Sequence, residues 1–140
     1  VKVRAYGPGG KSKRARPAKF RRSVSVTIGT VRFGPDSAVL TKKERGKVRG
    51  YARALARQGY TSVTLDGFTA RVANPGSDEF RQKLSMARAK SVKKVMRAKW
   101  KRMGVSVKVS IRARGDADPV GDNSNEEGRA KNRRATINIR

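Results

Sequence analysis

The apolar residues of this chain change their spacing along the sequence, and this change limits the folds available to it. They alternate with polar residues over Val24–Phe33, Val105–Arg112 and Ala135–Ile139, which is typical of strands that bury one face. Gly29 breaks the phase of the first stretch and predicts a bulge there. Val63–Leu65 is a further short strand. Four strands are therefore expected, and the segments between them do not show this alternation.

Those separating segments predict helices. The first helix begins at the capping box Thr41-Lys42-Lys43-Glu44, in which Thr accepts a free backbone N–H and Glu reaches back to the Thr backbone. It ends before Gly59. A longer helix with one apolar face follows from about Phe80 to Gly104, and a short helical turn around Arg129–Arg133 precedes the last strand. The order β-α-β-α-β-(α)-β predicts an α/β sandwich in which two main helices pack on a mixed sheet.

The charge is strongly one-sided. The 140 residues include 36 Lys or Arg against 10 Asp or Glu, for a formal charge of +26. Residues 1–22 carry nine basic side chains, no acidic ones and a Gly7-Pro8-Gly9-Gly10 stretch. Such a segment buries too little apolar surface to offset its ordering entropy. We therefore expect a flexible basic linker over 1–22 and one folded domain over 23–140.

Composition excludes several classes of protein. The chain has no Cys and no His, so it lacks thiolate nucleophiles, zinc–thiolate sites and the commonest general base. It also lacks nucleophile and phosphate-loop motifs, so we expect no enzyme and no cofactor. The acidic loop from Asp116 to Glu127 approaches calcium-loop spacing, but Pro119 and Val120 break it, so no metal site is expected.

No apolar run is long enough to span a bilayer. Because residue 1 is Val, we expect a fragment or mature region of a larger exported protein.

Four groups of motifs follow one another along the chain. They are Val31-Arg32-Phe33 with Asp36-Ser37-Ala38 and Leu40-Thr41; Asp66-Gly67-Phe68-Thr69; Leu84-Ser85 with Arg88-Ala89 and Val92; and Pro119-Val120 with Asp122-Asn123-Ser124 and Glu127 to Arg134. In this order they resemble the OmpA-like domain. The resemblance covers about three quarters of the chain, from Val31 to Ile139, and implies a domain of the bacterial cell envelope.

The resemblance implies a non-catalytic module that binds the peptide stem of peptidoglycan. In that family a loop Asp and a helix Arg hold the zwitterionic end of diaminopimelate, where an Asp suits the ammonium and a guanidinium fork suits the carboxylate. Arg88 matches the helix Arg, and Arg133 or Arg134 matches a supporting basic position. Together with the loop positions Phe68, Thr69 and Ala70, these are the candidate ligand-binding residues.

The chain departs from the family pattern at four positions. The loop Asp is replaced by Ala70 and the preceding His by Phe68, while Gly34 stands for an Asp after the first strand and Arg81 for a helix Asn. The cationic half of the ligand clasp is therefore kept and the acidic half is lost. Loss of a charge-assisted hydrogen bond costs about 1.5–3 kcal/mol, so the sequence predicts weaker binding of diaminopimelate. Either the site now favours anions, or the domain holds the wall mainly through its bulk charge.

The second helix carries charge of a single sign. No acidic residue occurs between Glu79 and Asp116, and like charges at i,i+4 repel, which indicates a polyanionic partner. Nucleic acid, anionic wall polymers and anionic lipid headgroups are candidates. The residues assigned to this polyanion patch are Lys90, Lys93, Lys94, Arg97 and Lys101.

Peptidoglycan, with anionic wall polymers, is thus the expected partner, and the function is cell-wall association aided or replaced by electrostatic attachment. One alternative is a basic nucleic-acid-binding module, for which a pI of about 11.7 is typical. Only 8 of 140 residues are aromatic, so nucleic acid is expected to bind only nonspecifically. A further alternative is a degenerate OmpA-like domain used for protein–protein packing.

Overall fold

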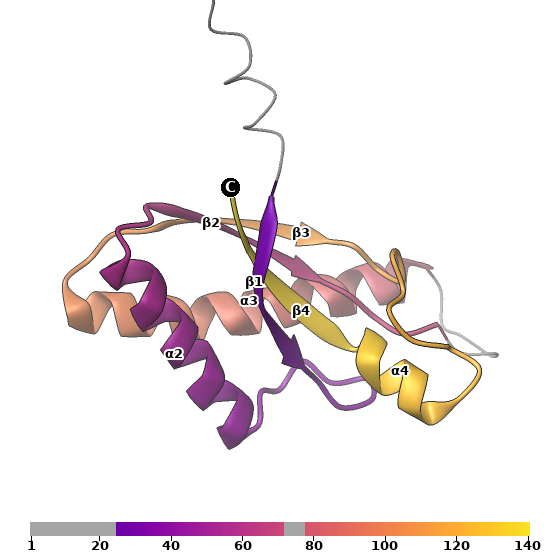
Figure 1. Cartoon of the computed structure of the whole chain (residues 1–140). Helices are drawn as coiled ribbons and strands as arrows, with labels where there is room; N and C mark the ends of the chain where they lie inside the picture. Colours follow the sequence, from indigo (N-terminus) through magenta and orange to yellow (C-terminus); the bar gives the residue numbers. More distant parts are fainter. Residues whose placement is uncertain (1–24, 72–77) are drawn as a thin grey trace, which may run out of the picture.

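The computed structural model describes residues 25–71 and 78–140, and the predicted linker over 1–22 lies outside them. The described chain forms four strands and three helices, arranged as in Figure 1. In chain order they are β1 (Val26–Arg32), α2 (Lys42–Arg57), β2 (Ser62–Gly67), α3 (Asp78–Met103), β3 (Lys108–Ala113), α4 (Glu126–Asn132) and β4 (Arg134–Ile139).

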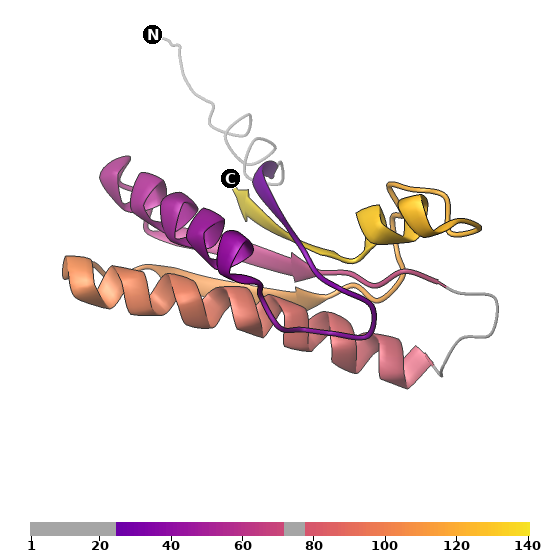
Figure 2. The same cartoon turned by 90° about the horizontal axis from the view of Figure 1, so that it is seen from below.

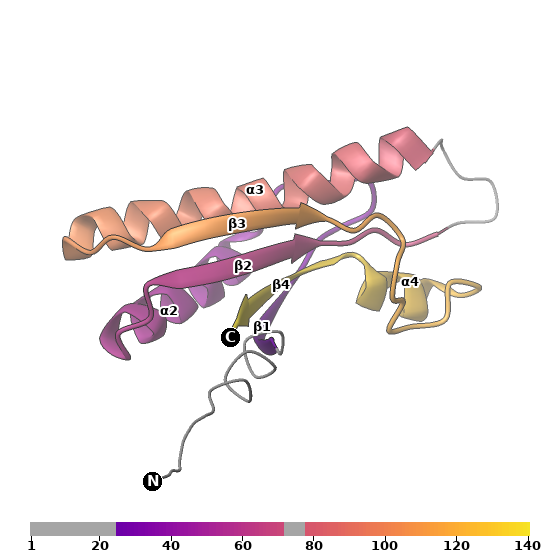
Figure 3. The same ribbon diagram turned by 90° about the horizontal axis from the view of Figure 1, so that it is seen from above.

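The strands form one mixed sheet in the order β1-β4-β2-β3. Only β2 and β3 run parallel, and β4 lies antiparallel to both β1 and β2. Helices α2 and α3 cover one face of this sheet, as Figure 2 shows. Neither of them covers the opposite face, which is seen in Figure 3. The predicted α/β sandwich is confirmed.

The core lies between the helices and the sheet. Alternate strand residues and one face of each long helix supply it, as the sequence pattern predicts. Trp100 is 2% exposed and its Nε1 donates to the carbonyl oxygen of Ala52 on α2 at 2.9 Å, which joins the two helices. Fully buried residues from both layers include Val31, Val48, Leu65, Val92, Met96 and Ile137.

The first helix begins as predicted, but its capping Glu has another partner. Thr41 is the N-cap and its Oγ1 accepts the Glu44 backbone N–H at 3.2 Å. The Glu44 carboxylate does not complete the capping box. It accepts from the backbone N–H of Arg32 at 2.8 Å, at the end of β1. Glu44 therefore ties α2 to the sheet. Both long helices are followed by a glycine at positive φ, Gly59 and Gly104.

The structure confirms the predicted bulge in the first strand and shortens the predicted third strand. The bulge in β1 is confirmed, because the β1–β4 register shifts between Thr27 and Gly29. The third strand begins at Lys108 rather than Val105. Its parallel partner β2 begins at Ser62, which pairs with Lys108, so the preceding alternating residues have no strand to pair with. Among the described residues, no helix is long and apolar enough to cross a bilayer.

Candidate functional site

A cavity of about 220 Å³ opens at one end of the helix layer. Four segments enclose it: the loop from β1 to α2, the loop after β2, the first half of α3, and α4 with the start of β4. Its wall combines apolar side chains with charges of both signs. The lining residues are Pro35, Asp36, Thr69, Ala70, Phe80, Arg81, Leu84, Arg88, Glu126, Arg129 and Arg133.

Arg88 forms the floor of this cavity and is completely buried. Its Nε donates to the carbonyl oxygen of Ser37 at 2.8 Å, Nη1 to Phe68 at 2.9 Å and Nη2 to Gly34 at 3.0 Å. One guanidinium thus fastens the β1–α2 loop and the loop after β2 to α3. The pKa of Arg88 is lowered to about 10, chiefly by burial and next by the charge of Arg133, while the charge of Asp36 opposes both. The side chain remains a cation at neutral pH.

Arg133 forms a second fixed cation. It is 9% exposed, and its Nε donates to the carbonyl oxygen of Phe33 at 3.2 Å. Its Nη2 pairs with the Glu126 carboxylate at 2.7 Å. The same carboxylate lies 3.5 Å from the Nε of Arg129. The hydrogen bond from Arg133 holds the pKa of Glu126 below its ordinary value, so this acid stays ionised well below neutral pH.

Two carboxylates line the cavity, and neither was predicted from the sequence to lie there. Asp36 is exposed in the turn after β1 and adopts φ of 51°, a conformation that Asp tolerates better than most residues. Glu126 opens α4 on the other side of the cavity. The expectation that the acidic half of the clasp is lost is therefore incomplete: the positions at Gly34 and Ala70 are not acidic, but Asp36 and Glu126 bring carboxylates to the same cavity.

Thr69 contributes an unusual polar group to the cavity wall. The residue is 4% exposed, and its Oγ1 has no hydrogen-bond partner among the described residues. A buried hydroxyl without a partner costs about 1–3 kcal/mol. Thr69 also lines the cavity, so this hydroxyl lies beside the cavity without a partner in the described chain. Ala70 and Phe80 add apolar surface next to it.

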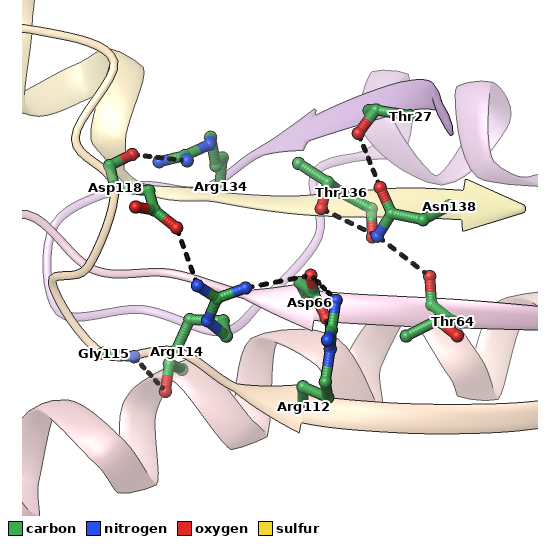
Figure 4. Close-up of polar contacts among 11 residues, drawn as sticks. Thr27, Thr64, Asp66, Arg112, Arg114, Gly115, Asp118, Arg134, Thr136 and Asn138 are labelled. Atoms are coloured by element: carbon green, nitrogen blue, oxygen red, sulfur yellow. Dashed lines mark hydrogen bonds and ion pairs between the residues drawn. The ribbon is translucent and has the colours of Figure 1, made fainter. Parts of the chain in front are cut away.

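The structure separates the predicted site residues into two groups. Arg88, Thr69, Ala70 and Arg133 line the cavity. Phe68 and Arg134 do not: their side chains lie on the opposite face of the sheet, where the Arg134 guanidinium stacks 3.8 Å from the Phe68 ring centroid. Figure 4 shows Arg134 on that face. Phe68 contributes to the cavity only through its carbonyl oxygen, which Arg88 binds.

Comparison with known proteins identifies the family. The model of the OmpA family matches residues 32–133. The chain belongs to the OmpA family. Relatives include the outer-membrane lipoprotein YfiB of Pseudomonas aeruginosa, 35% identical over 76% of this chain and 60% of YfiB. The peptidoglycan-binding protein ArfA of Mycobacterium tuberculosis is 33% identical over 81% of this chain and 33% of ArfA. The chain thus spans between a third and three fifths of these two relatives.

Solved structures of the OmpA family share this fold. The OmpA-like domain of FopA1 from Francisella tularensis superposes with a TM-score of 0.65 at 25% identity, covering 79% of this chain and 69% of that domain.

Arg81, at a position where an Asn is usual in the family, pairs here with Asp78 and with Asp116, the latter at 3.6 Å. This substituted Arg thus joins α3 to the loop after β3.

The predicted polyanion patch lies outside the cavity. At 100° per residue, one stripe along α3 contains Lys90, Lys94, Arg97 and Lys101, and these four side chains are exposed. Lys93 is half-buried and lies at the edge of this stripe. None of the five has an ion-pair partner within the described ranges 25–71 and 78–140. The stripe is therefore an uncompensated row of positive charge in this OmpA-family domain.

Proposed function

We propose that this domain attaches its parent protein to peptidoglycan in the bacterial cell envelope, without catalysing a reaction. The observation that carries the proposal is the cavity, in which fixed guanidinium groups, two carboxylates and a buried hydroxyl without a partner meet. ArfA, a relative that covers most of this chain, is named as a peptidoglycan-binding protein, which supports the same ligand.

The cavity suits the zwitterionic end of diaminopimelate. That group carries an ammonium and a carboxylate on one carbon, so it needs an anion and a cation close together. Asp36 and Glu126 are the candidate acceptors for the ammonium. Arg133 and the two guanidinium N–H groups that Arg88 does not use on carbonyls are the candidate donors for the carboxylate. Asp36 would thus supply the charge that Ala70 lacks.

The stripe on α3 adds a second, weaker mode of attachment. Exposed charges attract polyanions over about 8–10 Å at moderate salt and are screened at higher salt. We expect Lys94→Gln/Arg97→Gln to weaken binding to cell wall that retains its anionic polymers, at low salt only. Pocket binding should not respond to this change, because the stripe lies outside the cavity.

The test is co-sedimentation with peptidoglycan sacculi stripped of anionic polymers, at about 0.5 M salt, where exposed charges are screened. Retention should be competed by free diaminopimelate and should fall about tenfold or more in Asp36→Asn, which removes one charge-assisted acceptor. Glu79→Gln is the matched control, since it removes an exposed carboxylate of α3 that does not line the cavity.

Thr69→Val sharpens this test. Valine replaces the hydroxyl by a methyl group of similar size, so the folded domain loses no hydrogen bond and should be at least as stable to urea. Binding to stripped sacculi should nevertheless weaken if the hydroxyl meets the ligand. Retention that is unaffected by Asp36→Asn, by Thr69→Val and by diaminopimelate would refute the pocket.

A further inference from the structure

The sheet face that α2 and α3 leave uncovered carries a second positively charged hollow. It measures about 450 Å³ and extends along β1 and β4 and over the ends of β2 and β3. Five cationic and two acidic side chains line it, which leaves a formal excess of three positive charges. The cations are Arg32, Arg112, Arg114, Lys131 and Arg134, and the acids are Asp66 and Asp118.

The two acids are already occupied by arginines. Asp66 is 4% exposed and receives Arg112 at both carboxylate oxygens, at 2.7 and 2.8 Å. Arg114 lies 3.5 Å from Asp66 and donates to the Asp118 carboxylate at 2.7 Å. Figure 4 shows both arginines converging on Asp66. These pairs fix two guanidinium groups along the floor of the hollow and leave no carboxylate for the other cations.

Arg134 is held in place without a carboxylate. Its guanidinium lies against the Phe68 ring and its Nη2 donates to the carbonyl oxygen of Asp118 at 2.9 Å. Burial lowers the pKa of Arg134; the nearby Asp118 carboxylate raises it, and the charges of Arg32 and Arg114 lower it. Arg32 and Arg114 are therefore close enough to repel Arg134. An anion placed between them would relieve that repulsion.

Arg32 and Lys131 complete the hollow as exposed cations. Neither side chain has a hydrogen-bond or ion-pair partner in the described part of the chain. Three hydroxyl side chains, Thr27, Thr30 and Thr136, line the same hollow. Thr27 donates to the Asn138 side chain and Thr136 accepts from it, so Thr30 and Thr136 keep a hydroxyl proton for a ligand. Guanidinium forks match phosphate oxygens, and hydroxyls match a polyol. The surface thus offers donors to both parts of a phosphorylated polyol.

We propose that this uncovered sheet face binds a phosphodiester-linked polyol. Charge excludes two other occupants: a second copy of this chain carries +26, and residues 1–24 hold nine basic and no acidic side chains, so both are repelled. A nucleic acid is disfavoured because Phe68, the aromatic side chain that lines this hollow, is 4% exposed, whereas bases need exposed rings on which to stack. The proposal does not depend on peptidoglycan binding in the cavity.

The test is a calorimetric titration with a short poly(glycerol phosphate), paired with NMR of backbone amides. Arg32→Gln/Lys131→Gln should weaken binding about tenfold or more, because it removes two cations that hold nothing else in the described chain. Arg53→Gln/Arg57→Gln is the matched control: it removes the same charge from exposed positions of α2 and should change the affinity less than about threefold. Amide shifts should centre on β1 and β4.

Other outcomes would overturn the proposal. Equal losses in the two double variants, or shifts confined to α3, would mean that bulk charge alone attracts the polymer. Tighter binding of an oligothymidylate with the same number of phosphates would assign the face to nucleic acid, and preferential binding of anionic phospholipid vesicles would assign it to a membrane. Retention of Arg32→Gln/Lys131→Gln on stripped sacculi should remain at the wild-type level, which separates this test from that of the cavity.

Discussion

Arg133 and Arg134 are adjacent in the sequence, yet their guanidinium groups lie on opposite sides of the sheet. Arg133 enters the cavity beside α4 and pairs with Glu126 at 2.7 Å. Arg134 lies on the uncovered face, against Phe68. Arg133 is the C-cap of α4 and Arg134 is the first residue of β4, so the two side chains leave the chain at the junction between helix and strand, toward opposite faces. One dipeptide therefore supplies a cation to each of two independent charged hollows.

The first prediction uses this separation. Arg133→Gln should reduce retention on stripped sacculi about tenfold, because it removes a charged donor from the cavity. Arg134→Gln should leave that retention unchanged and should instead weaken binding of poly(glycerol phosphate). Binding isotherms of both variants with both ligands test this, after circular dichroism has shown that each is folded. Equal effects of the two substitutions on sacculus binding would contradict the placement of the two arginines.

The second prediction concerns the structural role of Arg88. Arg88→Lys keeps the charge, but an ammonium group cannot reproduce the fixed fork that meets the carbonyls of Ser37, Phe68 and Gly34. At about 1–3 kcal/mol for each buried group left without a partner, we expect a loss of roughly 2–4 kcal/mol in the free energy of unfolding. Arg97→Lys, an exposed change on the same helix, should stay within about 0.5 kcal/mol. Urea unfolding provides the measurement, and an unchanged midpoint for Arg88→Lys would count against this role.

The third prediction is a pH dependence at Glu126. Its pKa is lowered in the folded state, chiefly by the hydrogen bond from Arg133, from an ordinary value of 4.5. A depressed carboxylate pKa stabilises the fold above the unfolded-state pKa, and that stability is lost as pH falls through the lowered folded value. Glu126→Gln should therefore be less stable than wild type at neutral pH, and the difference should disappear at low pH.

A series of urea unfolding curves between about pH 7 and pH 2 tests this prediction. Glu127→Gln is the matched control, since Glu127 also lies in the first turn of α4 but has no ion-pair partner among the described residues. Its difference from wild type should be small and should vary little with pH. A Glu126→Gln difference that persists unchanged into acid would show that the carboxylate contributes no linked proton.

The sequence predicted the layers of this fold because its strands and helices have distinct apolar periods. It also identified Arg88 from its motif. The contacts of Arg88 were not predictable, because they join α3 to the carbonyl groups of Gly34, Ser37 and Phe68, between 20 and 54 residues away in the chain. Such contacts depend on how the loops fold over the helix, which local spacing does not encode.

The faces of Phe68 and Arg134 were missed for a related reason. The sequence predicted that the second strand ends at Leu65, but it continues to Gly67, and this extension fixes the face on which Phe68 lies. The acidic groups of the cavity were missed because the family pattern places its acids at the positions of Gly34 and Ala70, which are not acidic in this chain. Asp36 could have been found from its place in the turn just before Ser37-Ala38.

The last prediction tests the close contact between the sheet and α3. At Gly67 a Cβ atom would lie 1.8 Å from the backbone carbonyl oxygen of Ser85, so Gly67→Ala must push α3 away from β2. Overpacking against backbone costs about 3 kcal/mol or more. Gly46→Ala is the matched change on α2, where no atom beyond the helix's own local backbone lies within 4 Å of the new methyl group, and it should stabilise the helix by about 0.5–1 kcal/mol. Urea unfolding of both variants should therefore give shifts of opposite sign. Because Arg88 lies one turn after Ser85, Gly67→Ala should also weaken sacculus binding, whereas Gly46→Ala should not.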